Sequence, residues 1–156
     1  MSEYKNKYNG IENTELFLKT AFPIILSKNQ HTQLGVHFEE ISEMVDTITG
    51  KDAKTIFLLD MVSKANKALA LFLKENDNVI EIKPENRVEF LDGLCDQIVT
   101  ATGVAYMNGM DIVNGLAEVN RSNFSKFDEN GNPILDENLK MVKGPHYSKP
   151  NLKPFV

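Results

Sequence analysis

Apolar side chains recur every three or four residues over most of the first 120 positions, and this spacing constrains the fold more than any other feature of the sequence. Apolar residues at i, i+3, i+4 and i+7 form one face of an α-helix, whereas a strand alternates at every second residue. Strand-like alternation is scarce in this part of the chain. We therefore expect an all-α bundle of about five helices.

Prolines, glycines and polar breaks set the expected helix boundaries. Pro23 marks a kink or an early stop in the first helix, and Pro84 suits the first turn of the fourth. The expected helices cover residues 13–27, 34–48 (after a polar break at 28–32 and ended by Gly50), 52–75, 84–107 and 111–120. The turn-forming residues 128–133 predict a small hairpin or loop, and the prolines that follow predict an extended tail. We expect a single domain, residues 1–156, with core helices at about 13–121 and the hairpin and tail at 122–156.

Composition and charge restrict the partners and the compartment. The chain is 42% apolar, enough to form a core, and carries 17 basic against 22 acidic residues. A net charge of −5 argues against a nucleic-acid polymer as partner. Cys95 has no second cysteine to pair with, and its apolar sequence neighbours favour its burial as a small hydrophobic side chain. No apolar run reaches the length of a membrane span, so we expect no membrane partner and a cytoplasmic location.

Acidic residues follow one edge of the apolar face on two of the expected helices. Glu40 and Glu43 lie about 60° apart on the second helix, and Glu39 continues the same flank. On the fourth helix, three acids fall within about 60° of one another at the edge of an arc expected to be buried. These three are Glu89, Asp92 and Asp96.

Facing stripes of carboxylates would repel each other unless protons or cations neutralised them. Magnesium fits best, because it prefers oxygen ligands and commonly keeps water and substrate phosphates in its coordination shell. A di-iron site would need Glu-x-x-His pairs and zinc would need more cysteine and histidine, and the sequence offers neither pattern. The alternative is that these acids form an ordinary solvated helix face.

Amide, hydroxyl and cationic side chains are concentrated after the fourth helix, in residues 118–126 (EVNRSNFSK). Such groups suit the phosphates and sugar of a nucleotide, because Arg121 offers a planar fork of donors and Lys126 a point charge. The alternative is a polar helix end with its cap.

Together, the Glu39-Glu40-x-x-Glu43 element, the pair Asp92 and Asp96, and the 118–126 stretch resemble the MazG-like, all-α nucleoside triphosphate pyrophosphohydrolases. This family includes relatives of phosphoribosyl-ATP pyrophosphohydrolase and many phage-encoded members. The resemblance covers about residues 34–126. The first element alone is weak, whereas the ordered combination is considerably more specific.

The resemblance implies that four acids from two helices hold Mg²⁺, for which Mn²⁺ would substitute. A metal-associated water then cleaves the bond between the α and β phosphates, giving the monophosphate and pyrophosphate. The residues implied as catalytic are Glu39, Glu40, Glu43, Asp92 and Asp96. The implied metal ligands are Glu40, Glu43, Asp92, Asp96 and Glu89. The implied substrate contacts are Asn120, Arg121, Asn123 and Lys126.

The second acidic element departs from the family pattern, which is usually Glu-x-x-Asp. If Asp96 is the family's aspartate, Gly93 stands at the glutamate position and Asp92 would have to supply the carboxylate. Alternatively, Glu89-x-x-Asp92 is the motif in a shifted register. Both alignments stay open.

The resemblance also implies a homodimer or homotetramer, a nucleoside triphosphate substrate, and no role for nucleic acid or membranes. Two other functions are compatible with the sequence. One is a nucleotide-binding or regulatory bundle that is catalytically weak, which Gly93 would favour. The other is a helical interaction protein whose acids are surface charge.

Overall fold

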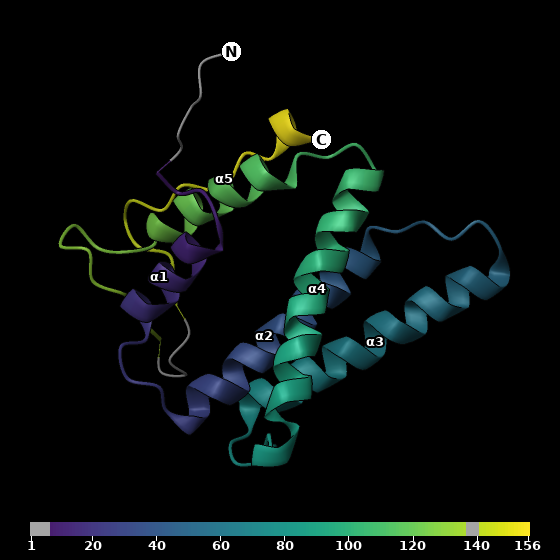
Figure 1. The fold of residues 1–156 in the computed structure, drawn as a ribbon, viewed down its shortest axis with the longest axis horizontal. Coiled ribbons are helices and arrows are strands. Elements are labelled where there is room, and N and C mark those ends of the chain that lie inside the picture. The colour runs from purple at the N-terminus through teal and green to yellow at the C-terminus, as the bar shows by residue number, and fades with distance from the viewer. Residues whose placement is uncertain (1–6, 137–140) are drawn as a thin grey trace. The chain divides into compact units, whose positions relative to one another are not determined.

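The computed structural model describes residues 7–136 and 141–156, and across these residues the regular structure is helical, with no strand (Figure 1). Its α-helices are α1 (Ile11–Ala21), α2 (Ser27–Asp46), α3 (Ala53–Glu75), α4 (Arg87–Met107) and α5 (Ile112–Phe124). Two short 3₁₀ helices are η1 (Pro84–Asn86) and η2 (Lys153–Phe155). The predicted all-α fold of about five helices is confirmed. No helix within the described residues is long and apolar enough to cross a membrane.

The chain divides into two compact units, which are described separately. The hairpin unit comprises Ile24–Glu81 and contains α2 and α3. The α5 unit comprises Met1–Pro23 and Ile82–Val156 and contains α1, α4 and α5. The expectation of a single domain over residues 1–156 stays a prediction.

The boundary between α1 and α2 differs from the predicted one. α1 ends at Ala21 rather than near residue 27, because Pro23 excludes the helical conformation for Phe22, which has φ −131° and ψ 69°. The polar segment 28–32, predicted as a break, belongs to α2. There the Asn29 side chain accepts a hydrogen bond from Leu26 N at 2.9 Å, so a polar residue caps the helix start instead of interrupting it.

Small side chains let α2 and α3 approach closely in the hairpin unit, where the two helices lie side by side (Figure 1). Gly35 is the tightest point, because a Cβ atom there would lie 2.8 Å from Ala70 O and 2.8 Å from Lys74 Cγ. Ser42 and Ser63 are also buried, each at or below 5% exposure. The contact face of α2 is therefore built largely from small residues rather than from the large apolar residues that the helical spacing emphasised.

His31 anchors the segment after α3 to the start of α2. It is 2% exposed, and its Nε2 accepts hydrogen bonds from Val79 N at 3.1 Å and Ile80 N at 3.3 Å. Its Nδ1 lies 3.0 Å from Ser27 O, so the network assigns the ring proton to Nδ1. The neutral imidazole thus satisfies backbone groups at both ends of the hairpin unit.

Aromatic rings form the core of the α5 unit. Phe17 stacks on Phe127 with ring centroids 5.4 Å apart, and it meets Phe124 edge-on at 5.7 Å. Ala21 and Ala117 are almost fully buried, at 1% and 0% exposure. These contacts join α1, the end of α5 and Phe127, three residues beyond α5, and so fix the position of the 118–126 stretch.

The segment after α5 forms a turn and then an extended tail. Asp128 Oδ1 accepts hydrogen bonds from Asn130 N and Asn132 N, and Gly131 takes a φ of 78°, which favours glycine. Asp128 N also donates to Asn132 O at 3.0 Å, so the predicted small hairpin or loop at 128–133 is a turn. An isolated antiparallel bridge joins Leu135 and Met141, after this turn. The tail then runs beside α5 (Figure 1).

The burial predicted for the apolar arc of α4 is not provided within the α5 unit, where no residue of this helix is buried. Val88 and Leu91, expected in the buried arc, are 76% and 62% exposed, and Cys95 is also exposed. The partners of α4 within its own unit are η1 and α5, which adjoin its two ends. The apolar arc of α4 is therefore present in the sequence but is not covered inside the α5 unit.

We predict that Gly35→Ala destabilises the hairpin unit by about 1–3 kcal/mol, because the added methyl group overlaps Ala70 O and Lys74 Cγ. Urea unfolding followed by circular dichroism would measure the change. Gly115→Ala is the control, since a Cβ atom there would meet nothing within 4 Å, and it should be neutral or stabilising by about 0.5–1 kcal/mol. Equal effects of the two substitutions would contradict the close approach of α2 and α3.

Candidate functional site

The acids of α2 differ in what surrounds them. Glu39 is half-buried and its Oε1 accepts from Lys74 Nζ of α3 at 2.7 Å, an ion pair within the hairpin unit. Glu40 and Glu43 are exposed and lie about 60° apart on the helix, as predicted. A neighbouring helix therefore holds the Glu39 carboxylate in place.

The acids of α4 form one stripe. Glu89, Asp92 and Asp96 are all exposed and fall within about 60° of one another around the helix. Among the residues that the structure describes, none of the three side chains has a hydrogen bond or an ion pair. Gly103 continues the stripe, and a Cβ atom there would meet nothing within 4 Å. The stripe is thus a row of like charges with an open surface beside it.

The donor chemistry of these acids suits magnesium, which takes carboxylate oxygens. Within residues 7–136 and 141–156, no three His, Cys, Asp or Glu side chains are grouped so that they could hold a metal ion. The α2 acids belong to the hairpin unit and the α4 acids to the α5 unit, and each stripe is described by itself. Magnesium binding by Glu40, Glu43, Asp92 and either Glu89 or Asp96 stays a prediction.

Asn120, predicted to contact substrate, is fully buried in the α5 unit, at 0% exposure. Its Nδ2 donates to Tyr8 O at 3.0 Å and Gly10 O at 3.2 Å, and its Oδ1 accepts from Thr14 Oγ1 at 2.9 Å. The amide therefore ties the chain entering α1 to the middle of α5.

Glu118 and Arg121 form a two-bond ion pair one turn apart on α5. Arg121 Nε lies 2.7 Å from Glu118 Oε2, and Arg121 Nη2 lies 2.8 Å from Glu118 Oε1. The Arg121 guanidinium, helped by the Asn151 backbone N–H, lowers the pKa of Glu118 to about 2. Glu118 in turn raises the pKa of Arg121. Both groups are fully charged near neutral pH.

The other two predicted substrate contacts pair with each other. Lys126 Nζ donates to Asn123 Oδ1 at 2.8 Å and lies 5.9 Å from the centre of the Phe17 ring. Both residues are half-buried. The structure therefore places Asn120, Arg121, Asn123 and Lys126 on the last two turns of α5 or just beyond, as the sequence implied, but with protein groups around each of them.

The tail binds along this part of α5, which the sequence did not indicate. Asn151 N donates to Glu118 Oε1 at 2.9 Å, and Arg121 Nη2 donates to Lys149 O at 3.3 Å. Ser148 N donates to Ser125 Oγ at 2.9 Å. These are backbone contacts of the tail, so no side-chain pattern in the sequence could have revealed them.

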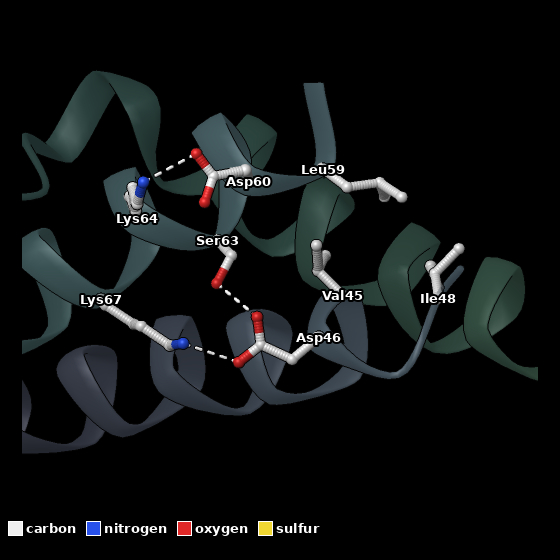
Figure 2. A pocket seen from close by; sticks show the side chains of 8 residues that line it. All are labelled: Val45, Asp46, Ile48, Leu59, Asp60, Ser63, Lys64 and Lys67. Carbon is white, nitrogen blue, oxygen red and sulfur yellow. Dashed lines mark hydrogen bonds and ion pairs between the residues drawn. The ribbon is translucent and has the colours of Figure 1, made fainter. Parts of the chain in front are cut away.

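A shallow pocket of about 260 Å³ lies in the hairpin unit between the end of α2 and the middle of α3 (Figure 2). Asp46 accepts from Ser63 Oγ and from Lys67 Nζ, each at 2.6 Å, and Lys67 and Ser63 together lower the pKa of Asp46. Lys64 pairs with Asp60 at 2.8 Å. Because its charged groups neutralise one another in this way, the pocket is a weaker candidate for a ligand site than the acid stripes.

Comparisons with known proteins identified no similar protein. No protein-family model matches the chain, and no significant match was found among curated proteins or solved structures.

We predict that the ion pair between Glu118 and Arg121 makes stability depend on acidic pH. Because the pKa of Glu118 is lowered from 4.5 to about 2, its contribution is fully present above about pH 4.5 and is lost as the pH falls towards 2. The difference in unfolding free energy between the wild type and Glu118→Gln, measured by urea unfolding, should shrink across this range. A difference that is constant from pH 5 to pH 2 would contradict the pairing.

Proposed function

We propose that this chain is a magnesium-dependent nucleoside triphosphate pyrophosphohydrolase that produces a monophosphate and pyrophosphate. The observation that carries the proposal is the ordered set of three motif elements, from Glu39 to Lys126, that resembles the MazG-like family. The all-α fold is compatible with it. Further support comes from Glu89, Asp92 and Asp96, which make up an exposed stripe with no counter-charge among the described residues.

In this proposal, Glu40, Glu43, Asp92 and either Glu89 or Asp96 bind magnesium. When bound, the ion would neutralise the phosphates and lower the pKa of a coordinated water. Glu39 precedes Glu40 on α2 and accepts from Lys74, so its carboxylate is oriented and can act as a base or as a further ligand.

Arg121 and Lys126 supply the positive charge for the phosphate chain in this proposal. Arg121 is the stronger candidate for a phosphate contact. Its guanidinium carries five N–H donors, and its two hydrogen bonds with Glu118 fix the plane of the group. The buried Asn120 would act indirectly, by holding α5 against the segment that enters α1. Asn123 would orient Lys126.

A second candidate is a nucleotide-binding module with little or no turnover. It is favoured by Gly93, which stands where the family pattern would place a glutamate if Asp96 is the aspartate. Calorimetry with magnesium and a nucleoside triphosphate separates the two functions, since a binding module takes up the nucleotide without releasing pyrophosphate.

We predict that the wild-type protein releases pyrophosphate from at least one common or modified nucleoside triphosphate when magnesium is present. Glu40→Gln and Asp92→Asn should each slow this release at least about 100-fold, since changing even groups that only orient metal ligands costs roughly 10–100-fold. A coupled pyrophosphate assay over a panel of nucleotides provides the measurement. No release from any nucleotide would overturn hydrolysis.

Matched variants decide the register of the second acidic element. If Asp96→Asn loses activity and Glu89→Gln does not, Asp96 is the family's aspartate and Gly93 stands at the glutamate position. If Glu89→Gln loses activity and Asp96→Asn does not, the motif is Glu89-x-x-Asp92. Glu85→Gln is the control, because this exposed acid precedes α4 outside the stripe and should leave turnover unchanged. Unchanged helical spectra would show that the variants fold.

We also propose that the protein is a homodimer or homotetramer. Leu91 and Ile98 lie within about 20° of each other, on the side of α4 roughly opposite to the acid stripe. They are 62% and 51% exposed in the single chain. A helix of this length relies on the packing of an apolar face for most of its stability, and a second copy would supply that packing.

We predict that Ile98→Lys shifts the protein to a monomer of 17.6 kDa. Burying one such apolar side chain contributes about 1.5–3 kcal/mol, which a buried ammonium would reverse. Light scattering after gel filtration would measure the mass, with Val113→Lys, an exposed apolar position on α5, as the control. A wild-type protein that is already monomeric at tens of micromolar would contradict the proposed oligomer.

A further inference from the structure

The C-terminal segment contacts Arg121, which the proposed function assigns to phosphate, and two polar side chains near it. Three α5-side groups, Glu118, Arg121 and Ser125, each make a hydrogen bond with the backbone of residues 148–151. A fourth contact, Asp111 N to Phe155 O at 2.9 Å, holds the end of the chain at the start of α5. We call residues 148–151 the strap.

Arg121 is the group that the strap affects most directly. Its Nη2 donates to Glu118 Oε1 at 2.8 Å and also to Lys149 O at 3.3 Å. An Nη2 atom carries two protons, so the ion pair and the strap together use both of them. A phosphate oxygen that approached Nη2 would have to replace either the carboxylate or the Lys149 carbonyl.

The carbonyl is the easier of the two to replace. The contact with Lys149 O is longer than both contacts with Glu118, and a neutral carbonyl is a weaker acceptor than a carboxylate. Bonds from a guanidinium to phosphate are charge-assisted and are roughly twice as strong as bonds between neutral groups. Ser148 and Lys149 are also exposed, so water can satisfy their backbone groups when they detach.

We propose that the strap is an autoinhibitory segment: residues 148–151 occupy Arg121 Nη2, and a phosphate chain must displace them to bind this atom. The inference rests on the proposed function, because it takes Arg121 as a phosphate contact. It adds that the free protein is closed at this position and that binding opens it. The strap is therefore expected to weaken binding of any polyphosphate to the α5 unit.

Backbone contacts allow a test that leaves every α5 side chain unchanged. The double variant Ser148→Pro/Asn151→Pro removes the two N–H groups that bond Ser125 and Glu118. The matched control, Ser148→Ala/Asn151→Ala, removes the same side chains but keeps both N–H groups. The {¹H}–¹⁵N nuclear Overhauser effect of Lys149, which is present in every variant, reports whether the strap is bound or mobile.

Calorimetry with magnesium tripolyphosphate measures the affinity. Loss of two hydrogen bonds at about 1 kcal/mol each should make the proline variant bind about tenfold more tightly or better than the wild type. Its Lys149 should be mobile without ligand, while the alanine variant should match the wild type in both measurements. In the wild type, tripolyphosphate should convert Lys149 from rigid to mobile.

Three results would overturn the strap proposal by itself, and a fourth would overturn it together with the phosphate role of Arg121. One is a mobile Lys149 in the proline variant without tighter binding, and another is a Lys149 that stays rigid in this variant. The third is tripolyphosphate bound to the wild type while Lys149 stays rigid, which would leave the proposed function standing. If the opened proline variant binds no tripolyphosphate at all, the phosphate role of Arg121 falls, and the strap proposal falls with it.

Discussion

The hydrogen bonds of the buried Asn120 amide hold the α5 unit together at its centre. A fully buried amide that lost its partners would cost about 1–3 kcal/mol, so the carbonyls of Tyr8 and Gly10 and the hydroxyl of Thr14 are required at this position. Because these bonds join α1 to the middle of α5, they fix which face of α5 points into the core. Glu118 and Arg121 lie outside this buried face of α5 and contact the tail.

Charge is distributed very differently over the two parts of the proposed site. On α5 and just after it each cation is engaged: Glu118 and the tail bind Arg121, and Asn123 binds Lys126. On α4 the acids Asp92 and Asp96 have no counter-charge within the described part of the chain. A row of unneutralised carboxylates is destabilising by itself, and a bound cation would remove that cost. The proposed function explains both features, since magnesium would serve the acids and a phosphate chain would compete for Arg121.

Local chemistry made much of the fold predictable. Pro23 was expected to end or bend the first helix, and α1 ends just before it. A new helix was expected after the break before Asp111, and there the Asp111 side chain caps α5 by accepting a hydrogen bond from Asn114 N. The same reasoning failed at residues 28–32, because it treated polar residues as a break although Asn29 caps the helix and His31 is buried. Helical periodicity shows that a face is apolar but not what covers it, and the α5 unit itself does not cover the apolar arc of α4.

The candidate site was predictable in its residue types and in its placement along each helix. The stripe of α4 and the flank formed by Glu40 and Glu43 follow directly from 100° per residue. The roles of Asn120 and of the tail did not follow, because their partners lie far away in the sequence. Asn120 bonds Thr14 across 106 positions, and the tail contributes backbone groups, which every sequence possesses. Long-range contacts of this kind carry no local signal.

Titration with Mn²⁺, which substitutes for Mg²⁺ and broadens nearby amide resonances, tests most directly whether acids of two helices share one ion. The account predicts that the amides around Glu40 and Glu43 on α2 and around Asp92 on α4 broaden together, at the same substoichiometric concentration, and that excess Mg²⁺ reverses the effect. Broadening confined to one of the two helices, or centred on other acids, would contradict it.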